Sequence, residues 1–294
     1  MISILIPTFN YNAYPLALAI EQQALRANII FELICIDDGS FSDHNIENQK
    51  INSLTNCKFI EGKRNIGRNA NRHLLAKKAQ YDWLLFIDSD VLPKTSHYIL
   101  NYLTIIPQDY DAAFGGFAYY DNPPSRDKTL RYYFGKQREE VSALIRNAQP
   151  YKVIISANFI IRKSIFLRIN KAETKNLYGL DYLFGGLLKT NSCKVHHIDN
   201  EVYHLGIDRN EDYLEKTKKA VETLYYINTT KKLKKHDNSL LNAYNRLKFI
   251  YLSGLFGKLL LRFNGKIEHN LLSENPSMFL FDLYRLGYFC RIKS

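Results

Sequence analysis

Residues Asp82 to Pro93 read Asp-Trp-Leu-Leu-Phe-Ile-Asp-Ser-Asp-Val-Leu-Pro. The apolar run from Trp83 to Ile87 is long enough for one buried strand and too short for a typical helix. It ends abruptly on Asp88-Ser89-Asp90. A strand buried on both faces leaves no water for two carboxylates, so these acids are expected at or beyond its carboxyl end.

Two carboxylates two residues apart on a turn offer oxygen ligands to a hard divalent cation and leave positions open for a phosphate. Aspartates at strand ends also make turns and cap the helices that follow. Asp88 and Asp90 by themselves therefore leave a metal site and an ordinary turn both open. The rest of the chain favours the metal site.

Short apolar strands alternate with helices along the first ninety residues. Strands are predicted at Ile2–Ile6, Phe31–Ile36, Cys57–Glu61 and Trp83–Ile87, and helices at Pro15 to about Arg26 and at Arg68–Gln80. This alternation predicts βαβ units, hence an α/β fold with a mostly parallel sheet flanked by helices. Ligands bind outside the carboxyl ends of such strands, where Pro7-Thr8, Asp37-Asp38 and Asp88-Ser89-Asp90 are expected.

Composition indicates a globular protein with an unevenly charged chain. Of the 294 residues, 46% are hydrophobic and 13% aromatic, which is enough for a core and excludes a disordered protein. Residues 216–294 hold 15 Lys and Arg against 5 Asp and Glu, which leaves 25 against 24 in the first 215. The basic tail suits an anionic partner, either a membrane surface, nucleic acid or a polyanionic substrate.

The chain has features of a protein kept in a reducing compartment. Its four cysteines lack metal-like spacing, and no disulfide is expected. The first residues, Met1 to Pro7, have no basic segment of the kind that opens a signal peptide. No apolar stretch reaches about 18 residues, so no membrane span is predicted. A cytoplasmic location is expected.

The motifs of residues 1–95 resemble, in order and spacing, the inverting glycosyltransferases of family 2, which have the GT-A nucleotide-sugar-binding fold. The matching segments are Ile4-Leu5-Ile6-Pro7-Thr8-Phe9-Asn10, Glu32-Leu33-Ile34-Cys35-Ile36-Asp37-Asp38-Gly39-Ser40, Asn65 and Gly67 with Arg72, and Phe86-Ile87-Asp88-Ser89-Asp90. One departure is His73, because the family usually has Asn after the Arg.

The resemblance implies a nucleoside-diphosphate sugar donor, with a UDP-sugar favoured, and a divalent metal, Mn or Mg. Asp38 would accept a hydrogen bond from the nucleotide base, and Arg72 would lie beside the base or the phosphate of the donor. Asp37 is expected to be a turn residue. Arg64 and Arg68 are further cations near the phosphate site, and of the two alternatives, a phosphate contact or a solvated side chain, the solvated side chain is favoured. The donor-binding set implied is Pro7, Thr8, Asn10, Asp38, Asn65, Arg72, Asp88 and Ser89.

The resemblance implies a third metal ligand at His204, with Asp88 and Asp90. Imidazole suits manganese better than magnesium. A single His after a short strand-like run is otherwise a structural residue, and this alternative stays open. Past Pro93, Gly115-Gly116 and the aromatic residues after them are expected to close a sugar pocket, since Gly lets backbone approach a ligand.

The segment Tyr178-Gly179-Leu180-Asp181-Tyr182-Leu183 resembles one that usually reads Gly-Glu-Asp-aromatic and opens a helix. The second acid of that pair is the catalytic base in inverting relatives, which implies this role for Asp181. Leu180 replaces the first acid, a departure that bears on activity or acceptor class. The alternative for Asp181 is a carboxylate that only stabilises the start of the helix.

The C-terminal part is predicted to be a basic, helical extension. The predicted division is a catalytic domain at 1–212, with a nucleotide-binding half at 1–95 and an acceptor half at 96–212, and an extension at 213–294. Leu247–Phe263 has apolar spacings of three and four with flanking cations, which suits an amphipathic helix on an anionic membrane. Packing against the catalytic domain is the alternative, and Phe279–Phe289 is a second such segment. No nucleic-acid motif is present, and no nucleic-acid partner is expected.

Taken together, these features predict a metal-dependent inverting glycosyltransferase of cell-surface polysaccharide or lipid-linked glycan synthesis. It would be cytoplasmic and peripheral on the inner face of the plasma membrane. Two alternatives remain, a non-catalytic membrane adaptor with this fold and a phosphatase or phosphotransferase with an Asp nucleophile. Val91 and Leu92 after the acids disfavour the phosphatase, whose motif is usually followed by Gly or Thr.

Overall fold

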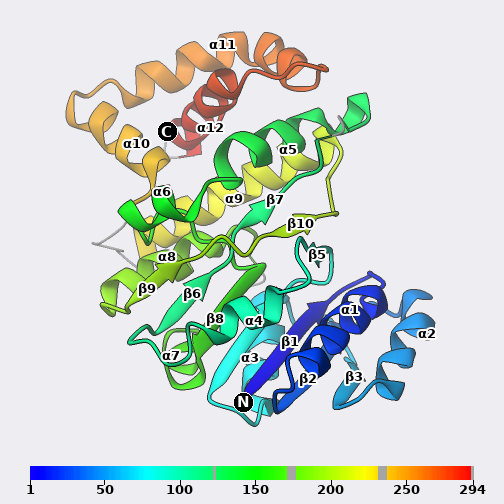
Figure 1. The fold of residues 1–294 in the computed structure, drawn as a ribbon. Helices are drawn as coiled ribbons and strands as arrows, with labels where there is room; N and C mark the ends of the chain where they lie inside the picture. Colours follow the sequence, from blue (N-terminus) through cyan, green and yellow to red (C-terminus); the bar gives the residue numbers. More distant parts are fainter. Residues whose placement is uncertain (122–123, 171–176, 231–236, 293–294) are drawn as a thin grey trace. The chain divides into compact units, whose positions relative to one another are not determined.

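The computed structural model describes residues 1–121, 124–170, 177–230 and 237–292 (Figure 1). The chain divides into two compact units. Unit 1 comprises Met1–Ala118, Val141–Asn176 and Thr190–Gly206, and unit 2 comprises Tyr119–Glu140, Leu177–Lys189 and Ile207–Ser294. Residues 119–140 and 177–189 thus pack with the C-terminal helices. The domain boundary predicted at residue 212 stays a prediction.

Unit 1 is built on a seven-stranded sheet with the order β3-β2-β1-β4-β8-β6-β9. The first four strands in that order are parallel, β8 is antiparallel to both its neighbours, and β9 is parallel to β6. The predicted mostly parallel α/β sheet is therefore confirmed. The strands are β1 (Ile2–Thr8), β2 (Phe31–Asp37), β3 (Cys57–Glu61), β4 (Trp83–Ile87), β6 (Ala112–Phe114), β8 (Asn158–Arg162) and β9 (Val195–His197).

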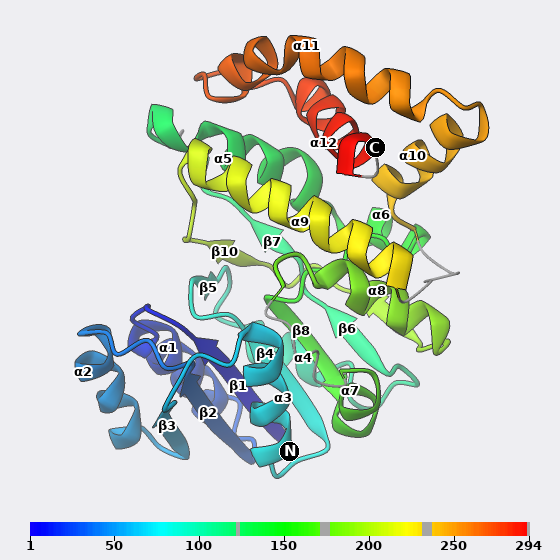
Figure 2. The same cartoon turned by 180° about the vertical axis from the view of Figure 1, so that it is seen from behind.

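Helices cover both faces of this sheet. The chain steps from β1 to β2 in one direction and from β3 to β4 in the other, so right-handed crossovers place α1 and α3 on opposite faces. α4 packs beside α1, and α7 packs beside α3, as the two opposed views show (Figures 1 and 2). The helices of unit 1 are α1 (Tyr14–Arg26), α2 (His44–Asn48), η1 (Gln49–Ser53), α3 (Arg68–Lys78), α4 (Tyr98–Leu103), α6 (Ala143–Ala148) and α7 (Lys163–Ile169).

A small three-stranded sheet, ordered β5-β10-β7, completes unit 1. Its strands are β5 (Val91–Pro93), β7 (Phe117–Ala118) and β10 (Val202–His204). β5 begins directly after Asp90, and β10 pairs with it in the antiparallel sense. This pairing brings a segment from late in the chain to the end of β4.

The first strand is longer than the sequence predicts. Pro7 was expected to end it, but β1 continues to Thr8 and pairs with β2 over its whole length. β1 pairs with β4 only from Ser3 to Leu5, so the N–H that Pro7 lacks is not needed on that side. A proline is tolerated at a position where one neighbouring strand has already ended.

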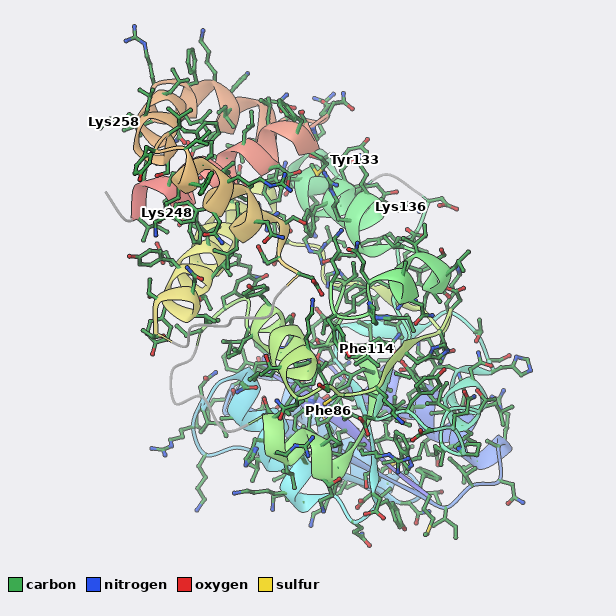
Figure 3. The ribbon with its side chains drawn as sticks, turned by 90° about the vertical axis from the view of Figure 1, so that its left-hand side faces the viewer. Phe86, Phe114, Tyr133, Lys136, Lys248 and Lys258 are labelled. Atoms are coloured by element: carbon green, nitrogen blue, oxygen red, sulfur yellow. The ribbon has the colours of Figure 1, made fainter. Side chains whose placement is uncertain are left out.

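Aromatic rings and one amide fill the middle of unit 1. The rings of Phe86 and Phe159 stack with centroids 5.0 Å apart, and Phe114 stacks on Phe159 at 5.3 Å; Figure 3 labels Phe86 and Phe114. Asn158, fully buried, accepts hydrogen bonds from the hydroxyls of Tyr98 and Tyr102 at 2.7 and 2.6 Å. Because buried hydroxyls are costly when unpaired, Asn158 holds α4 against the sheet.

Arg146 and His197 form a second buried polar centre. The Arg146 guanidinium donates to the carbonyl oxygens of Phe114 and Ile198 at 3.1 and 2.8 Å. Its Nη1 also lies 3.0 Å from Nδ1 of His197, whose Nε2 lies 2.9 Å from the carbonyl oxygen of Pro150. A neutral ring that donates through Nε2 and accepts at Nδ1 satisfies both partners. Burial and the charge of Arg146 lower the pKa of His197 to about 4.

Unit 2 is helical, and α12 is its central element. α12 packs against α9, α10 and α11. Tyr213 of α9 and Phe281 of α12 stack with centroids 5.8 Å apart in one apolar cluster, and Tyr244 of α10 contacts Phe289 of α12 in a second. The helices of unit 2 are η2 (Arg126–Lys128), α5 (Thr129–Phe134), η3 (Gly135–Glu139), α8 (Asp181–Thr190), α9 (Asn210–Thr230), α10 (Ser239–Phe249), α11 (Ser253–Leu271) and α12 (Met278–Ile292).

The C-terminal segments differ from the prediction in one respect. Leu247–Phe263 is not one helix, because α10 ends at Phe249 and α11 begins at Ser253. The run Lys231-Lys232-Leu233-Lys234-Lys235 lies outside the described residues. Among the helices that the structure describes, none has both the length and the apolar character to cross a bilayer.

The buried neutral His197 predicts an acid-sensitive fold. The pKa of His197 in the folded protein, about 4, lies below the ordinary value of roughly 6.5. The neutral ring therefore contributes its full stabilisation of the fold above a pH of about 6.5, and this stabilisation is lost as the pH falls toward 4. Between pH 7.5 and pH 5 we expect the free energy of unfolding to fall by about 2 kcal/mol more in the wild type than in His197→Gln. Urea denaturation measures this difference. His44→Gln, at an exposed histidine, should behave as the wild type; an identical pH response of the wild type and His197→Gln would contradict the assignment.

Candidate active site

Three neighbouring strands end at one edge of the main sheet. β1 lies between β2 and β4, and Thr8 stands opposite Asp37 in the β1–β2 register. The backbone N–H of Asp38 donates to the carbonyl oxygen of Thr8 at 2.8 Å. Asp88 follows the last residue of β4 directly. The polar turns after the three strands are therefore brought together, as the sequence predicts.

Asp37 and Asp38 have different surroundings. The Asp37 carboxylate accepts from the backbone N–H and the hydroxyl of Ser40 at 2.9 and 2.6 Å, and it closes the turn as expected. Asp38 accepts from the backbone N–H groups of Ile66 and Gly67, both at 2.9 Å. Burial raises the pKa of Asp38, the two backbone hydrogen bonds lower it, and the charge of Asp37 raises it, so the net shift is upward. Asp38 thus connects the end of β2 to the turn before α3.

Asp88 is held by two guanidinium groups from one helix. One carboxylate oxygen accepts from Arg72 at 2.6 Å, and the other pairs with Arg68. Arg72 also donates to the hydroxyl and the carbonyl oxygen of Ser156, at 2.8 and 2.6 Å. The Arg72 side chain is 8% exposed, whereas that of Arg68 is 52% exposed. Arg72 is therefore built into the protein, and Arg68 lies at the surface of the site.

Arg68 corrects one prediction from the sequence. A solvated side chain was favoured over a phosphate contact, but the half-exposed guanidinium pairs with Asp88. The reason is its position in the first turn of α3, whose start is fixed by the Asp38 hydrogen bonds to the preceding turn.

Asp90 and His204 meet although they lie far apart in the chain. The β5–β10 pairing sets His204 opposite Val91, and Nε2 of His204 lies 3.5 Å from Oδ2 of Asp90. The His204 ring is stacked on Phe117, with centroids 5.0 Å apart. Burial alone would raise the pKa of Asp90, but the His204 hydrogen bond and charge and the charge of Arg68 outweigh it and lower the pKa.

The backbone closes tightly around Asp90. The N–H of Leu205 donates to the carbonyl oxygen of Asp90 at 2.9 Å. A Cβ at Gly206 would lie 2.4 Å from Oδ2 of Asp90, so a larger residue here would displace the Asp90 carboxylate. Asp90 also acts on Tyr11: burial, and then the charge of Asp90, raise the pKa of the Tyr11 hydroxyl.

The remaining predicted donor-site residues lie in unit 1. Pro7 and Thr8 are buried at the end of β1, and Asn10 is exposed in the turn that follows, with φ of 50°. The Asn65 side chain accepts from the N–H of Gly67 at 3.1 Å, and Ser89 is half-buried between the two acids. Their roles in binding a donor stay predictions.

The glycines at 115 and 116 are closely surrounded by other parts of unit 1. A Cβ at Gly115 would lie 2.3 Å from the carbonyl oxygen of Asn200, and one at Gly116 would lie 2.8 Å from Nη2 of Arg146. Protein atoms therefore occupy the space that a side chain would take at either position, and a sugar pocket closed by this segment stays a prediction. The pair is glycine because the Asn158 and Arg146 polar centres need close backbone approach.

Asp181 is the first residue of α8, in unit 2. The predicted helix start is thus observed, and Leu180 precedes it as the acceptor of the N–H of Phe184 at 3.0 Å. A carboxylate in this first turn is stabilised by the helix dipole whether or not it is catalytic. Its catalytic role stays a prediction.

The metal predicted at Asp88, Asp90 and His204 can be tested against the donor atoms. Both oxygens of Asp88 are engaged by arginines, and no group of three acidic, His or Cys side chains is gathered for a metal among the described residues. Asp90 and His204 remain as an oxygen and a nitrogen donor 3.5 Å apart. Two adjacent ligands of an octahedral ion with bonds of about 2.1 Å lie ~3 Å apart, so this pair fits a divalent ion.

Sequence reasoning missed Ser156, Asn71 and Tyr11. Ser156 precedes the antiparallel strand β8, whose start lies beside the end of β4, and Asn71 donates to the carbonyl oxygen of Ile36 at 3.0 Å. Ser156 and Asn158 are polar residues in an otherwise apolar run, which is a signal that sequence alone offers. Nothing local distinguishes Asn71 or Tyr11.

The buried contacts of Arg72 predict a large stability loss on its removal. Arg72→Met leaves Asp88 with one partner at a position shielded from water, and we expect the free energy of unfolding to fall by about 3 kcal/mol. Ser156→Ala removes one hydroxyl contact and should cost about 1 kcal/mol. Chemical denaturation measures both, with Arg26→Met at an exposed arginine as the control. An effect of Arg72→Met no larger than that control would refute the role assigned to Arg72.

Comparisons with known proteins agree with the observed geometry. The family model described as glycosyl transferase family 2 matches residues 3–169. No curated protein matches the chain. A crystal structure of Staphylococcus aureus TarS residues 1–349 in complex with UDP-GlcNAc is similar over 98% of this chain and 90% of that one, with a TM-score of 0.54 and 16% identity. The same TarS segment in another crystal structure has a TM-score of 0.50, 16% identity and the same coverage.

The structural likeness supports the fold, and the family model covers more than half of the chain, including the strand ends that carry Thr8, Asp38 and Asp88. We conclude that the chain belongs to glycosyl transferase family 2 and is a glycosyltransferase with the GT-A fold.

Proposed function

We propose that this glycosyltransferase moves a sugar from a nucleoside-diphosphate sugar to an acceptor hydroxyl, with metal assistance and inversion at the anomeric carbon. The observation that carries the proposal is the meeting of Asp38, Asp88, Asp90 and His204 at the carboxyl edge of the strands of unit 1. A UDP-sugar is the favoured donor, and the related TarS structure was solved with UDP-GlcNAc.

Asp38 is suited to recognise the nucleotide base. Its two oxygens each accept one backbone N–H, and a carboxylate has about four acceptor positions, so capacity remains for a base imide. The same hydrogen bonds hold Asn65 and the start of α3 in place. The base would therefore be read by a side chain whose position is fixed before the donor arrives.

The diphosphate would meet Arg68 before Arg72. Arg68 is half-exposed and pairs with Asp88, whereas Arg72 is buried between Asp88 and Ser156. We propose that Arg68 contributes to phosphate binding and that Arg72 positions Asp88. A direct contact of Arg72 with the nucleotide, as the family resemblance implies, stays a prediction.

Asp90 and His204 are the residues proposed to hold the divalent ion, Mn or Mg. An oxygen and an imidazole nitrogen suit manganese better than magnesium. When bound, the ion neutralises charge on the departing nucleoside diphosphate. Asp88 would become a ligand only if an arginine released one of its oxygens, because both oxygens are engaged by Arg68 and Arg72.

Asp181 is proposed to remove the proton from the acceptor hydroxyl as that oxygen attacks the anomeric carbon. Inversion requires the base and the leaving group on opposite sides of the sugar, and alignment of donor and acceptor supplies much of the rate. Leu180 stands where relatives carry a further acid, so the acceptor contacts of this enzyme are expected to differ there. The proposed acceptor is a growing cell-surface or lipid-linked glycan at the inner face of the plasma membrane.

A thermal-shift panel of UDP-, GDP-, dTDP- and CMP-sugars tests the donor site. We expect one nucleotide class to raise the melting temperature in the presence of manganese, because a ligand that binds only the folded state stabilises it. Asp90→Ala and His204→Ala should abolish the metal-dependent part of the shift. Asp82→Ala, an exposed acid at the opposite end of β4, is the matched control. No shift with any nucleotide would refute the donor site.

Steady-state transfer and slow donor hydrolysis test Asp181. Asp181→Asn should lower kcat about 10²- to 10⁴-fold while leaving donor affinity unchanged, since only the proton transfer is lost. Asp212→Asn removes an exposed carboxylate from the first turn of α9 and should leave kcat unaffected. Equal effects of the two changes would assign Asp181 to helix stability only. Complete absence of donor turnover in the wild type would favour the non-catalytic adaptor.

A further inference from the structure

α11 exposes a row of large apolar side chains. Leu255, Leu259 and Phe263 are four residues apart, so they share one face of the helix, and they are 65%, 53% and 43% exposed. The turn that leads into α11 continues this surface. Phe249, the last residue of α10, and Tyr251, in the turn, are 85% and 93% exposed.

A row of cations runs beside the apolar row. Lys258, Arg262 and Lys266 are also four residues apart, and all three are exposed. Arg246 and Lys248 add two exposed cations on the last turn of α10; Figure 3 labels Lys248 and Lys258 on these helices. Residues 239–267 contain no Asp or Glu. Among the described residues, none of these five cations is in an ion pair.

The opposite face of α11 holds the helix in unit 2. Ile267 and Leu271 are buried in the cluster formed with α12, and Gly257 lies against Cys290 of α12. The inward face of α11 therefore already accounts for its packing. The exposed rows are left for a partner. We call them the α10–α11 face, made of Phe249, Tyr251, Leu255, Leu259 and Phe263 with Arg246, Lys248, Lys258, Arg262 and Lys266.

We propose that the α10–α11 face docks on an anionic lipid surface. Parallel rows of apolar and cationic side chains match a bilayer interface, where apolar groups enter the acyl boundary and cations meet the phosphates. The inference deepens the proposed function, because a membrane-bound enzyme reaches a lipid-linked acceptor. It specifies these ten residues within the basic C-terminal part.

Charge argues against the other occupants. A two-fold contact between copies of this chain would place the same patch on both sides, so five cations would face five cations without an acid among them. A nucleic acid would neutralise the cations but leave Leu255, Leu259 and Phe263 in water. An anionic lipid surface provides partners for both rows.

Vesicle flotation with the full chain tests the proposal without donor or acceptor, so it is independent of the transferase assays. Vesicles of phosphatidylcholine alone are compared with vesicles that also contain phosphatidylglycerol. We expect binding to the anionic vesicles only, and weaker binding at high salt because the charges are screened.

Paired substitutions assign the binding to this face. Lys258→Gln with Arg262→Gln should weaken binding on the order of 10- to 30-fold, and Leu255→Ser with Leu259→Ser by about tenfold or more. Lys77→Gln with Lys78→Gln removes the same charge from exposed positions of α3, and Leu144→Ser removes an 84% exposed apolar side chain from α6. Both controls should bind as the wild type.

Several results would overturn the proposal. These are no binding of the wild type to anionic vesicles, equal binding to neutral vesicles, or equal losses in the control variants. A further contradicting result would come from light scattering in solution. If the wild type is a dimer and Leu255→Ser with Leu259→Ser makes it a monomer, the α10–α11 face joins two copies of the chain. Circular dichroism and the donor-induced thermal shift confirm that each variant is folded and keeps its nucleotide site.

Discussion

The candidate active site depends on the neutralisation of Asp88. Its carboxylate lies at the end of a fully buried strand, where an uncompensated charge would be costly, and two arginines of α3 supply the compensation. Arg72 continues to Ser156, beside the start of the antiparallel strand β8. One guanidinium thereby ties a helix on one face of the sheet to two neighbouring strands. Asp88, helix α3 and the start of the antiparallel strand β8 are therefore held together by the contacts of Arg72.

The other acids are positioned through the backbone. Asp38 holds the turn before α3 by accepting its N–H groups, and Asp90 is enclosed by β5, β10 and the close approach of Gly206. Such contacts leave little freedom for reorganisation on donor binding, which is what a site that stabilises developing charge requires. The half-exposed Arg68 is the exception, and its position suits a side chain that exchanges Asp88 for a phosphate.

Unit 2 shows a different use of the same residue types. α9, α10 and α11 each pack against α12. Aromatic contacts such as Tyr213–Phe281 and Tyr244–Phe289 lie in these interfaces. The outward face of α11 has apolar and cationic rows with no acid nearby. The sequence pattern left membrane binding and packing both open. In the structure one face of α11 packs against α12 and the opposite face is exposed, and the membrane contact that we propose would use the exposed face.

The sequence by itself determined the alternating strands and helices, the mostly parallel sheet and the acids at its strand ends, because these follow from local periodicity and turn chemistry. It placed β3 and β4 at their observed bounds, and the family resemblance implied that a helix opens in the segment of Asp181, where α8 begins. It did not show that Pro7 stays in β1 or that α10 and α11 are separate helices. Nor did it show that neighbouring protein atoms pack closely against Gly115 and Gly116. Only the tertiary structure decided which partner each charge has: Arg68 and Arg72 on Asp88, and His204 on Asp90. Those pairs join residues far apart in the chain through strand pairing and crossovers, and no local pattern in a single sequence encodes such contacts.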